Sequence, residues 1–158
     1  MANEIRGILI PVANDKKVLL PNAIIAEVVS YKDLKVSATA PDWYVGSVNW
    51  RGYENIPVVC YESLSTKSVA TRNTEGRIAV IKALGKLEGL PYFAIIVKGV
   101  PRLQVVTQGD LQLHELEEDT SNAIASQVTI QDELSDIPNI RFIEHVLNVL
   151  LSSTQEEE

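Results

Sequence analysis

Cysteine, methionine and histidine are scarce in this 158-residue sequence, which holds one, one and two of them. A single cysteine cannot form an intrachain disulfide, and Cys60 ends an apolar run in which a thiol packs as a small hydrophobe. Structural zinc sites use four cysteine or histidine ligands, and no such spacing occurs along the chain. We therefore expect no disulfide, no metal and no cofactor, and a reducing, cytoplasmic setting.

The sequence also lacks the residue patterns of common catalytic sites. The segment Gly85–Gly89 has none of the lysine-threonine arrangement of a nucleotide-binding loop and is typical of a turn. His114 and His145 have no local signature that would make Cys60 a nucleophile. The acidic run from Glu115 to Asp119 is typical of a solvated loop, because no spacing directs its carboxylates towards one point. The sequence therefore predicts a protein that is not an enzyme.

Long apolar runs and excess positive charge are missing as well. The longest apolar runs, such as Phe93–Val97, have the length of a strand, well short of the roughly 20 residues of a membrane-spanning helix. The formal net charge is -7, and residues 101–158 carry 2 Lys and Arg against 12 Asp and Glu. An acidic protein does not fit nucleic acid or an anionic membrane surface as a partner. The N-terminus lacks the features of a secretory signal.

Apolar residues make up 46% of the sequence, which is enough for a folded core. Alternating and continuous apolar runs predict strands at residues 7–13, 16–20, 25–29, 47–50, 56–61, 77–84, 90–97, 102–107 and 127–130, with loops at 62–76 and 108–122. One amphipathic helix follows Pro138–Asn139, with an apolar face at Ile143, Val146, Leu147, Leu150 and Leu151, and with Glu144 and Asn148 facing out. This pattern indicates a mainly β fold, barrel-like or sandwich-like.

The segment from Pro41 to Tyr61 holds both tryptophans and the cysteine. Pro41 can open a helical turn, which Gly46 is expected to end. Two short strands then surround a turn that begins at Arg51 and Gly52. The unusual feature of this hairpin is an arginine at its tip.

This hairpin resembles the signature of the CheW-like domain, the coupling module of bacterial chemosensory arrays. The resemblance rests on Pro41, Gly46, Arg51–Gly52 and the run Ile56–Val59. Further segments resemble the family in the same order, and together they cover most of the chain: Lys17–Val29, Leu90–Val97, Val100 and Val105–Val106. Departures from the family pattern occur at Trp50, Lys98 and Arg141–His145. They suggest a divergent member, of the kind that serves type IV pilus or twitching control.

The resemblance implies a fold of two intimately packed five-stranded SH3-like barrels with a C-terminal helix. Residues 1–151 would form one such domain of two subdomains, and residues 152–158 an acidic tail. The implied function is that of an adaptor without catalytic activity, which joins the cytoplasmic tip of a chemoreceptor to the regulatory domain of a histidine kinase. Ile25, Glu27 and Val28 match the kinase-contacting strand of the family, and Gly46, Arg51 and Gly52 match the motif beside the receptor groove.

Other interpretations of the same residues stay open at this point. Ile25 and Val28 are also explained as core residues of a strand. Arg51 can act as a brace that donates hydrogen bonds to backbone carbonyls. Gly46 and Gly52 are explained by a positive φ or by a close approach of backbone. For the whole chain, the alternatives are a β-barrel small-molecule sensor and an adaptor for a non-chemosensory pilus or kinase partner.

Overall fold

The structure is a computed structural model that describes residues 4–13, 16–31, 34–36, 40–66, 76–87, 90–107, 109, 111–130 and 132–156. The elements in these ranges are β1 (Glu4–Ala13), β2 (Lys16–Pro21), a 3-10 helix (Asn22–Ile24), β3 (Ile25–Tyr31), β4 (Tyr44–Trp50), β5 (Tyr53–Val59), α1 (Tyr61–Thr66), β6 (Gly76–Leu87), β7 (Leu90–Val97), β8 (Arg102–Thr107), β9 (Leu111–His114), β10 (Ile124–Ile130), β11 (Glu133–Pro138) and α2 (Ile140–Glu156).

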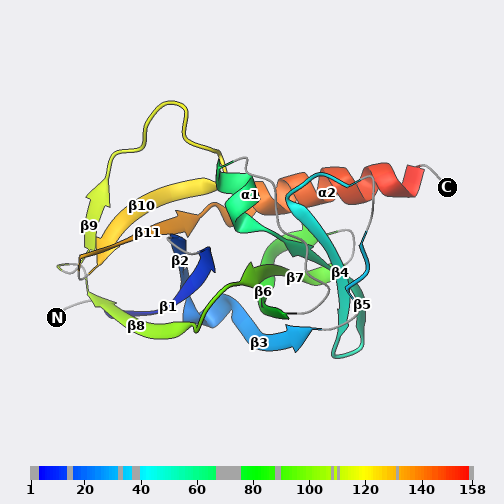
Figure 1. Cartoon of the computed structure of the whole chain (residues 1–158), viewed down its shortest axis with the longest axis horizontal. Helices are drawn as coiled ribbons and strands as arrows, with labels where there is room; N and C mark the ends of the chain where they lie inside the picture. Colours follow the sequence, from blue (N-terminus) through cyan, green and yellow to red (C-terminus); the bar gives the residue numbers. More distant parts are fainter. Residues whose placement is uncertain are drawn as a thin grey trace.

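The strands form two sheets that lie side by side, and α2 runs from the middle of the molecule along the five-stranded sheet, where it contacts β6 (Figure 1). One sheet has five strands in the order β3-β6-β7-β5-β4, all from the middle of the chain. The other has six strands in the order β8-β1-β2-β11-β10-β9, and both ends of the described chain contribute to it. Most neighbours are antiparallel, and β2 with β11 and β5 with β7 are the parallel pairs. The predicted fold class, two packed SH3-like β-barrels with a C-terminal helix, is confirmed, although one sheet has six strands where five were expected.

In the described part of the chain, the buried apolar side chains form three clusters. One cluster lies within the barrel that the five-stranded sheet forms, and another within the barrel that the six-stranded sheet forms. The largest lies between the sheets and draws on both, together with α2. Its members are Ile10, Val12, Val18, Leu20, Val59, Tyr61, Ala79, Ile81, Phe93, Ile95, Val97, Ala123, Ile124, Ile140, Ile143 and Leu147. The two halves therefore share one core.

A buried carboxylate ties α1 to the six-stranded sheet. Asp136 on β11 accepts a hydrogen bond from the Tyr61 hydroxyl at 2.9 Å and one from Gln127 Nε2 at 3.0 Å. The Lys16 ammonium lies 3.3 Å from Asp136 and also donates to the Ser65 hydroxyl. A buried charge needs a partner charge and hydrogen bonds, and Asp136 has both. Burial among these groups raises the pKa of Tyr61 far above its ordinary range.

Several elements differ from those expected. Gly46 lies inside β4 instead of ending a turn, and Gly85 lies inside β6 instead of opening a turn. Tyr61 begins α1 instead of ending a strand, so a helix occupies the start of the predicted loop over 62–76. Strand β9 occupies part of the predicted loop over 108–122, and β11 was not predicted. Helix α2 continues to Glu156, so the predicted acidic tail is helical over most of its length, and the proposed boundary after residue 151 stays a prediction. Residues 88–89 of the expected turn and residues 67–75 of the expected loop lie outside the described residues.

Glu144 was expected to face solvent, and this expectation is wrong. Its side chain is only 6% exposed, because it lies on the same face of α2 as Ile143 and Leu147. The carboxylate accepts hydrogen bonds from the backbone N–H groups of Leu84 at 2.8 Å and Gly85 at 2.7 Å. Glu144 therefore holds the helix against the far end of β6.

Replacing Glu144 should weaken the fold measurably. Glu144→Ala leaves two backbone donors of β6 without an acceptor, which costs about 1–3 kcal/mol of unfolding free energy. Arg141→Ala, an exposed change in the same helix, is the matched control and should cost within about 0.5 kcal/mol. Urea denaturation measures both variants. Equal midpoints for the two would show that the contact to β6 contributes nothing.

Candidate functional site

The β4–β5 hairpin turns through two residues, Arg51 and Gly52, between the paired residues Trp50 and Tyr53. Both central residues have positive φ, 47° for Arg51 and 84° for Gly52. Two-residue hairpins favour such turns because their twist matches that of the strands, and Asn-Gly is the preferred pair. An arginine with positive φ is uncommon and strained. The backbone of this turn would be served better by asparagine, so its requirements do not explain Arg51.

The Arg51 side chain reaches across to β3. Its Nε donates to Glu27 Oε1 and its Nη2 to Glu27 Oε2, each at 3.1 Å, in a bidentate arrangement. The Trp50 indole N–H donates to the same Glu27 Oε1 at 2.8 Å. Glu27 thus joins the hairpin tip to an edge strand of the same sheet.

Three aromatic rings support this ion pair from the hairpin side. The Trp50 ring stacks on Tyr53 and meets the edge of Tyr92, with centroids 6.3 Å and 4.9 Å apart. Tyr53 and Tyr92 are 5.1 Å apart. The Arg51 guanidinium carbon lies 5.5 Å from the Trp50 ring centroid, within reach of a cation–π interaction. Arginine, tryptophan and tyrosine are the residue types enriched at the energetic centres of protein interfaces.

The charges at this site are fixed by their hydrogen bonds. The Arg51 guanidinium, with a smaller contribution from the Trp50 N–H, lowers the pKa of the Glu27 carboxyl below its ordinary value. The Arg51 side chain remains 66% exposed. Because exposed ion pairs are screened by water and contribute little to stability, the arrangement is better suited to presenting a charged group than to holding the fold.

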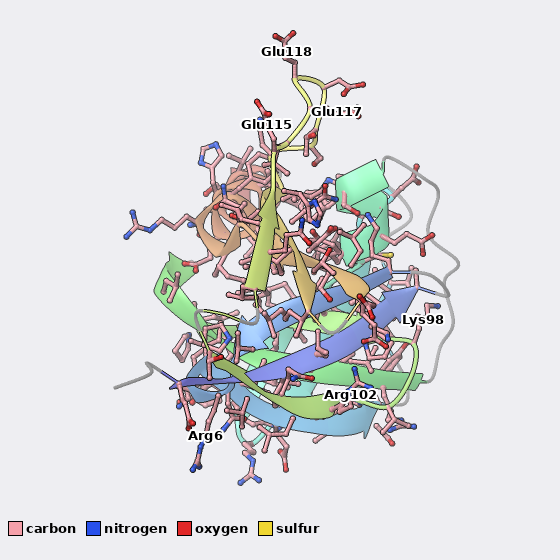
Figure 2. All side chains as sticks on the ribbon, turned by 90° about the vertical axis from the view of Figure 1, so that its left-hand side faces the viewer. Arg6, Lys98, Arg102, Glu115, Glu117 and Glu118 are labelled. Atoms are coloured by element: carbon pink, nitrogen blue, oxygen red, sulfur yellow. The ribbon has the colours of Figure 1, made fainter. Side chains whose placement is uncertain are left out.

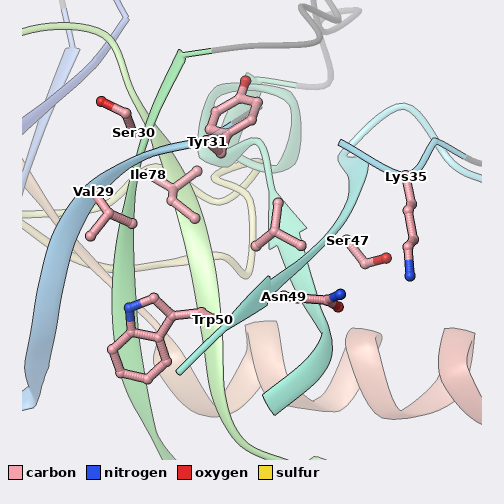
Figure 3. Close-up of a pocket in the computed structure, with 9 residues that line it drawn as sticks. Val29, Ser30, Tyr31, Lys35, Ser47, Asn49, Trp50 and Ile78 are labelled. Atoms are coloured by element: carbon pink, nitrogen blue, oxygen red, sulfur yellow. The ribbon is translucent and has the colours of Figure 1, made fainter. Parts of the chain in front are cut away.

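A groove of about 400 Å³ lies beside this cluster, between β3 and β4. These strands are the two edges of the five-stranded sheet, and in the described part of the chain no backbone pairing joins them. The groove is lined by Val29, Ser30, Tyr31, Lys35, Ser47, Val48, Asn49, Trp50 and Ile78, and Figure 3 shows the Trp50 ring near Val29 with Lys35 at the other end. The ion pair of Glu27 and Arg51 spans the same gap between the edges.

Gly46 shapes the other side of this groove. The backbone of Lys35 pairs with Ser47 on the outer edge of β4, with N–O distances of 2.9 and 3.0 Å. Gly46 has φ 154°, and a Cβ there would lie 2.3 Å from the Lys35 carbonyl oxygen. Only glycine permits this close approach. The interpretation of Gly46 as a position of close backbone approach fits this geometry.

The structure brings some of the predicted site residues together and separates others. Glu27, Arg51 and Gly52 meet at the hairpin tip, while Gly46 lies further along β4. Ile25 and Val28 are half-buried and pack against the core between the sheets. The Arg51 brace runs to the Glu27 carboxylate, whereas backbone carbonyls were expected. Trp50, Tyr53 and Tyr92 were not among the predicted site residues. Trp50 and Tyr53 flank the predicted turn, and their position next to Arg51 was a signal that could have identified them. No sequence pattern links Tyr92, on β7, to the hairpin.

The predicted absences can be compared only with the described part of the chain. There, no three His, Cys, Asp or Glu side chains gather where they could hold a metal ion. Cys60 is buried in the core of the five-stranded sheet, whereas His114 lies on β9 beside Thr129, so the two do not approach one another. Among the helices in the described ranges, none has the length and apolar character needed to cross a membrane.

The fold and this site describe a module with two β-barrels, a groove at a sheet edge and a preorganised arginine beside it. The sequence matches the CheW-like domain over residues 6–146, and the chain belongs to this family. Among solved structures, the fold is similar to the scaffolding protein TtCheW from Thermoanaerobacter tengcongensis, with a TM-score of 0.68 and 16% identity over 89% of this chain and 88% of that chain. No curated protein matches the sequence.

Substitutions of three glycines test separately the positive φ and the close backbone approach that the structure requires. In Gly46→Ala, the alanine must adopt a positive φ and its Cβ clashes with backbone. This variant should lose about 1–3 kcal/mol of unfolding free energy or more. Gly52→Ala meets only the positive φ, since nothing lies within 4 Å of the new Cβ. Gly109→Ala meets neither and is the control. Thermal and urea unfolding should rank the losses in that order, and a Gly46 variant as stable as the control would contradict the geometry.

The titration of Glu27 should depend on Arg51. Folding lowers the Glu27 pKa, so this group stabilises the fold above the pKa of an unfolded glutamate, and the contribution disappears as pH falls through the lower folded pKa. Carboxyl NMR titration of Arg51→Ala should show the Glu27 pKa raised towards its ordinary value. Glu133 is the internal control, because Lys17 and Arg102 lower its pKa and neither residue is changed. An unmoved Glu27 pKa would contradict the bidentate contact.

Proposed function

We propose that the chain is an adaptor without catalytic activity, which acts in the cytoplasm and couples the tip of a chemoreceptor to the regulatory domain of a histidine kinase in a bacterial chemosensory complex. Membership of the CheW-like domain family supports this proposal. So does the fold it shares with a protein described as a scaffolding protein. A coupling protein requires binding surfaces and no reactive groups.

The observation that carries the proposal is the conformation of Arg51. Its backbone has a strained positive φ where asparagine would be favoured, yet the side chain is held in place by Glu27 and lies over Trp50. Strain of this kind persists at functional sites. Two of the five guanidinium N–H donors bind Glu27, so three are left without a described acceptor. We infer that these donors bind a partner.

The two proposed partner surfaces meet at this ion pair. Glu27, with Ile25 and Val28, belongs to the proposed kinase surface on β3. Arg51, with Gly46 and Gly52, belongs to the proposed receptor surface beside the groove. An adaptor in which one contact connects both surfaces has a direct physical route from one partner to the other, because moving either side chain removes hydrogen bonds from the other.

A small-molecule sensor is a weaker candidate. In the described part of the chain, buried apolar side chains fill the interior of each barrel. The groove between β3 and β4 lies between two strand edges, and Cys60 and His114 do not converge on it. An adaptor for a type IV pilus array remains a variant of the main proposal, and partners copurified from the native cell would distinguish it.

The variant Arg51→Asn separates binding from stability. Asparagine suits the positive φ and keeps the Asn-Gly turn, so the melting temperature should stay the same or rise. Loss of the guanidinium should weaken binding to the receptor tip by at least about tenfold, as expected for an arginine at the centre of an interface. Isothermal titration calorimetry with a receptor cytoplasmic fragment, and separately with the kinase regulatory domain, measures this.

Arg141→Asn removes an exposed arginine from α2 and is the matched control, which should bind as the unchanged protein does. If folded Arg51→Asn also binds as the unchanged protein does, Arg51 is only a brace. If the unchanged protein binds neither the kinase domain nor the receptor fragment, the proposed function is wrong.

A further inference from the structure

Glu27, the acceptor of the hairpin ion pair, receives hydrogen bonds from two different side chains. Its Oε1 accepts from the Trp50 indole N–H at 2.8 Å and from Arg51 Nε at 3.1 Å, while its Oε2 accepts from Arg51 Nη2, also at 3.1 Å. The contact with Trp50 is the shortest of the three. Because the indole and the guanidinium share one oxygen, the place of the indole decides where the carboxylate can receive the guanidinium.

Trp50 and Arg51 differ in how firmly the fold holds them. The Trp50 ring is half-buried and packs against the apolar cluster within the barrel of the five-stranded sheet. Its centroid lies 4.9 Å from that of Tyr92 on β7, an interior strand of this sheet. A tryptophan ring is placed by two torsions, whereas an arginine has many rotamers to lose, and the Arg51 side chain is 66% exposed. The rigid member of the group is therefore Trp50.

The ion pair by itself would hold Glu27 only weakly. Glu27 lies on the edge strand β3, and its side chain is 35% exposed. Exposed ion pairs are screened by water, and two long side chains must lose rotamer freedom to form one. The hydrogen bond from the half-buried indole orders only one such side chain, that of Glu27. With this bond in place, Arg51 meets a carboxylate whose position is already set.

We propose that Trp50 is the positioning residue of this site, which holds Glu27 in place so that Glu27 and the Trp50 ring together set the direction of the Arg51 guanidinium. The ring adds a second contact, because the guanidinium carbon lies 5.5 Å from its centroid. The inference rests on the proposed function, in which Arg51 contacts a receptor. A guanidinium with a fixed direction selects a partner whose carboxylate or carbonyl oxygen meets the remaining N–H groups at one angle.

Two NMR measurements test the positioning without a partner. Trp50→Phe keeps an aromatic ring and removes the indole N–H. Trp43→Phe makes the same change at the other tryptophan, which packs against the core between the sheets, and is the matched control. The Glu27 pKa should rise in Trp50→Phe alone, because the indole N–H helps to lower it. The Arg51 Nε–H signal should show a more mobile side chain in Trp50→Phe alone.

The unchanged protein provides a third measurement, which does not depend on a variant. The indole N–H signal of Trp50 should shift as Glu27 titrates, since the two groups share a hydrogen bond, and the indole signal of Trp43 should not. The spectrum of Trp43→Phe assigns the two signals. A Trp50 signal that does not follow the titration of Glu27 would overturn the proposal.

A double-mutant cycle separates positioning from direct contact with the partner. In calorimetry with the receptor cytoplasmic fragment, Trp50→Phe should weaken binding by about two- to tenfold, which is the range for the entropy of fixing one long side chain. In the Arg51→Asn background, Trp50→Phe should cause no further loss, because no guanidinium remains to be positioned. Trp43→Phe should change binding in neither background. Additive losses would show that Trp50 contacts the partner itself and would overturn the proposal.

The remaining outcomes distinguish this inference from the proposed function. Circular dichroism confirms that each variant is folded. An unchanged Glu27 pKa with an equally ordered Arg51 in Trp50→Phe would overturn the positioning, and so would full affinity for the receptor fragment despite a mobile Arg51. If the unchanged protein binds no receptor fragment, the proposed function is wrong, whereas the NMR measurements still support or overturn the positioning of Arg51 by Trp50.

Discussion

The apolar core between the two sheets is the feature on which the rest of the structure depends. Ile10 and Leu20 come from one sheet, Ile81 and Phe93 from the other, and Leu147 from α2, and all are fully or almost fully buried. Neither sheet could cover this surface alone, because the cluster takes its buried residues from both sheets and from α2. Separating them would expose the core. The relative position of the sheets is thereby fixed.

Because the core fixes the two sheets against each other, the edge strands are where the molecule can offer backbone groups to a partner. In the five-stranded sheet, the β3 and β4 edges are bridged by side chains, through Glu27 with Trp50 and Arg51, and a groove remains beside the bridge. In the six-stranded sheet, β8 and β9 are the edge strands, and no such bridge joins them in the described residues. The proposed binding surfaces therefore lie at edges, where backbone and side chains are both accessible.

The sequence predicted elements whose own residues determine their burial. Strands β6 and β7 were predicted from the sequence because their apolar residues alternate with polar ones or form a continuous run. Strand β11 was missed because Asp136 sits in its middle, and only Lys16, Tyr61 and Gln127, distant in sequence, make that charge tolerable. Glu144 was misplaced for the same reason, since its partners are backbone groups of β6. A buried charge whose partners are distant in sequence produces no pattern in the neighbouring residues, so the sequence does not reveal it.

The hairpin motif illustrates the same limit at the functional site. Resemblance identified Arg51 and Glu27 as members of two separate surfaces, and the structure shows them bound to each other. The two interpretations of Arg51, as a brace and as a partner contact, are compatible in this geometry. Glu27 occupies one side of the guanidinium and fixes its direction, and fixing an arginine before binding reduces the entropy that a partner contact would cost. Under the proposed function, a brace of this kind would prepare the arginine for binding, and this role would account for its strained backbone.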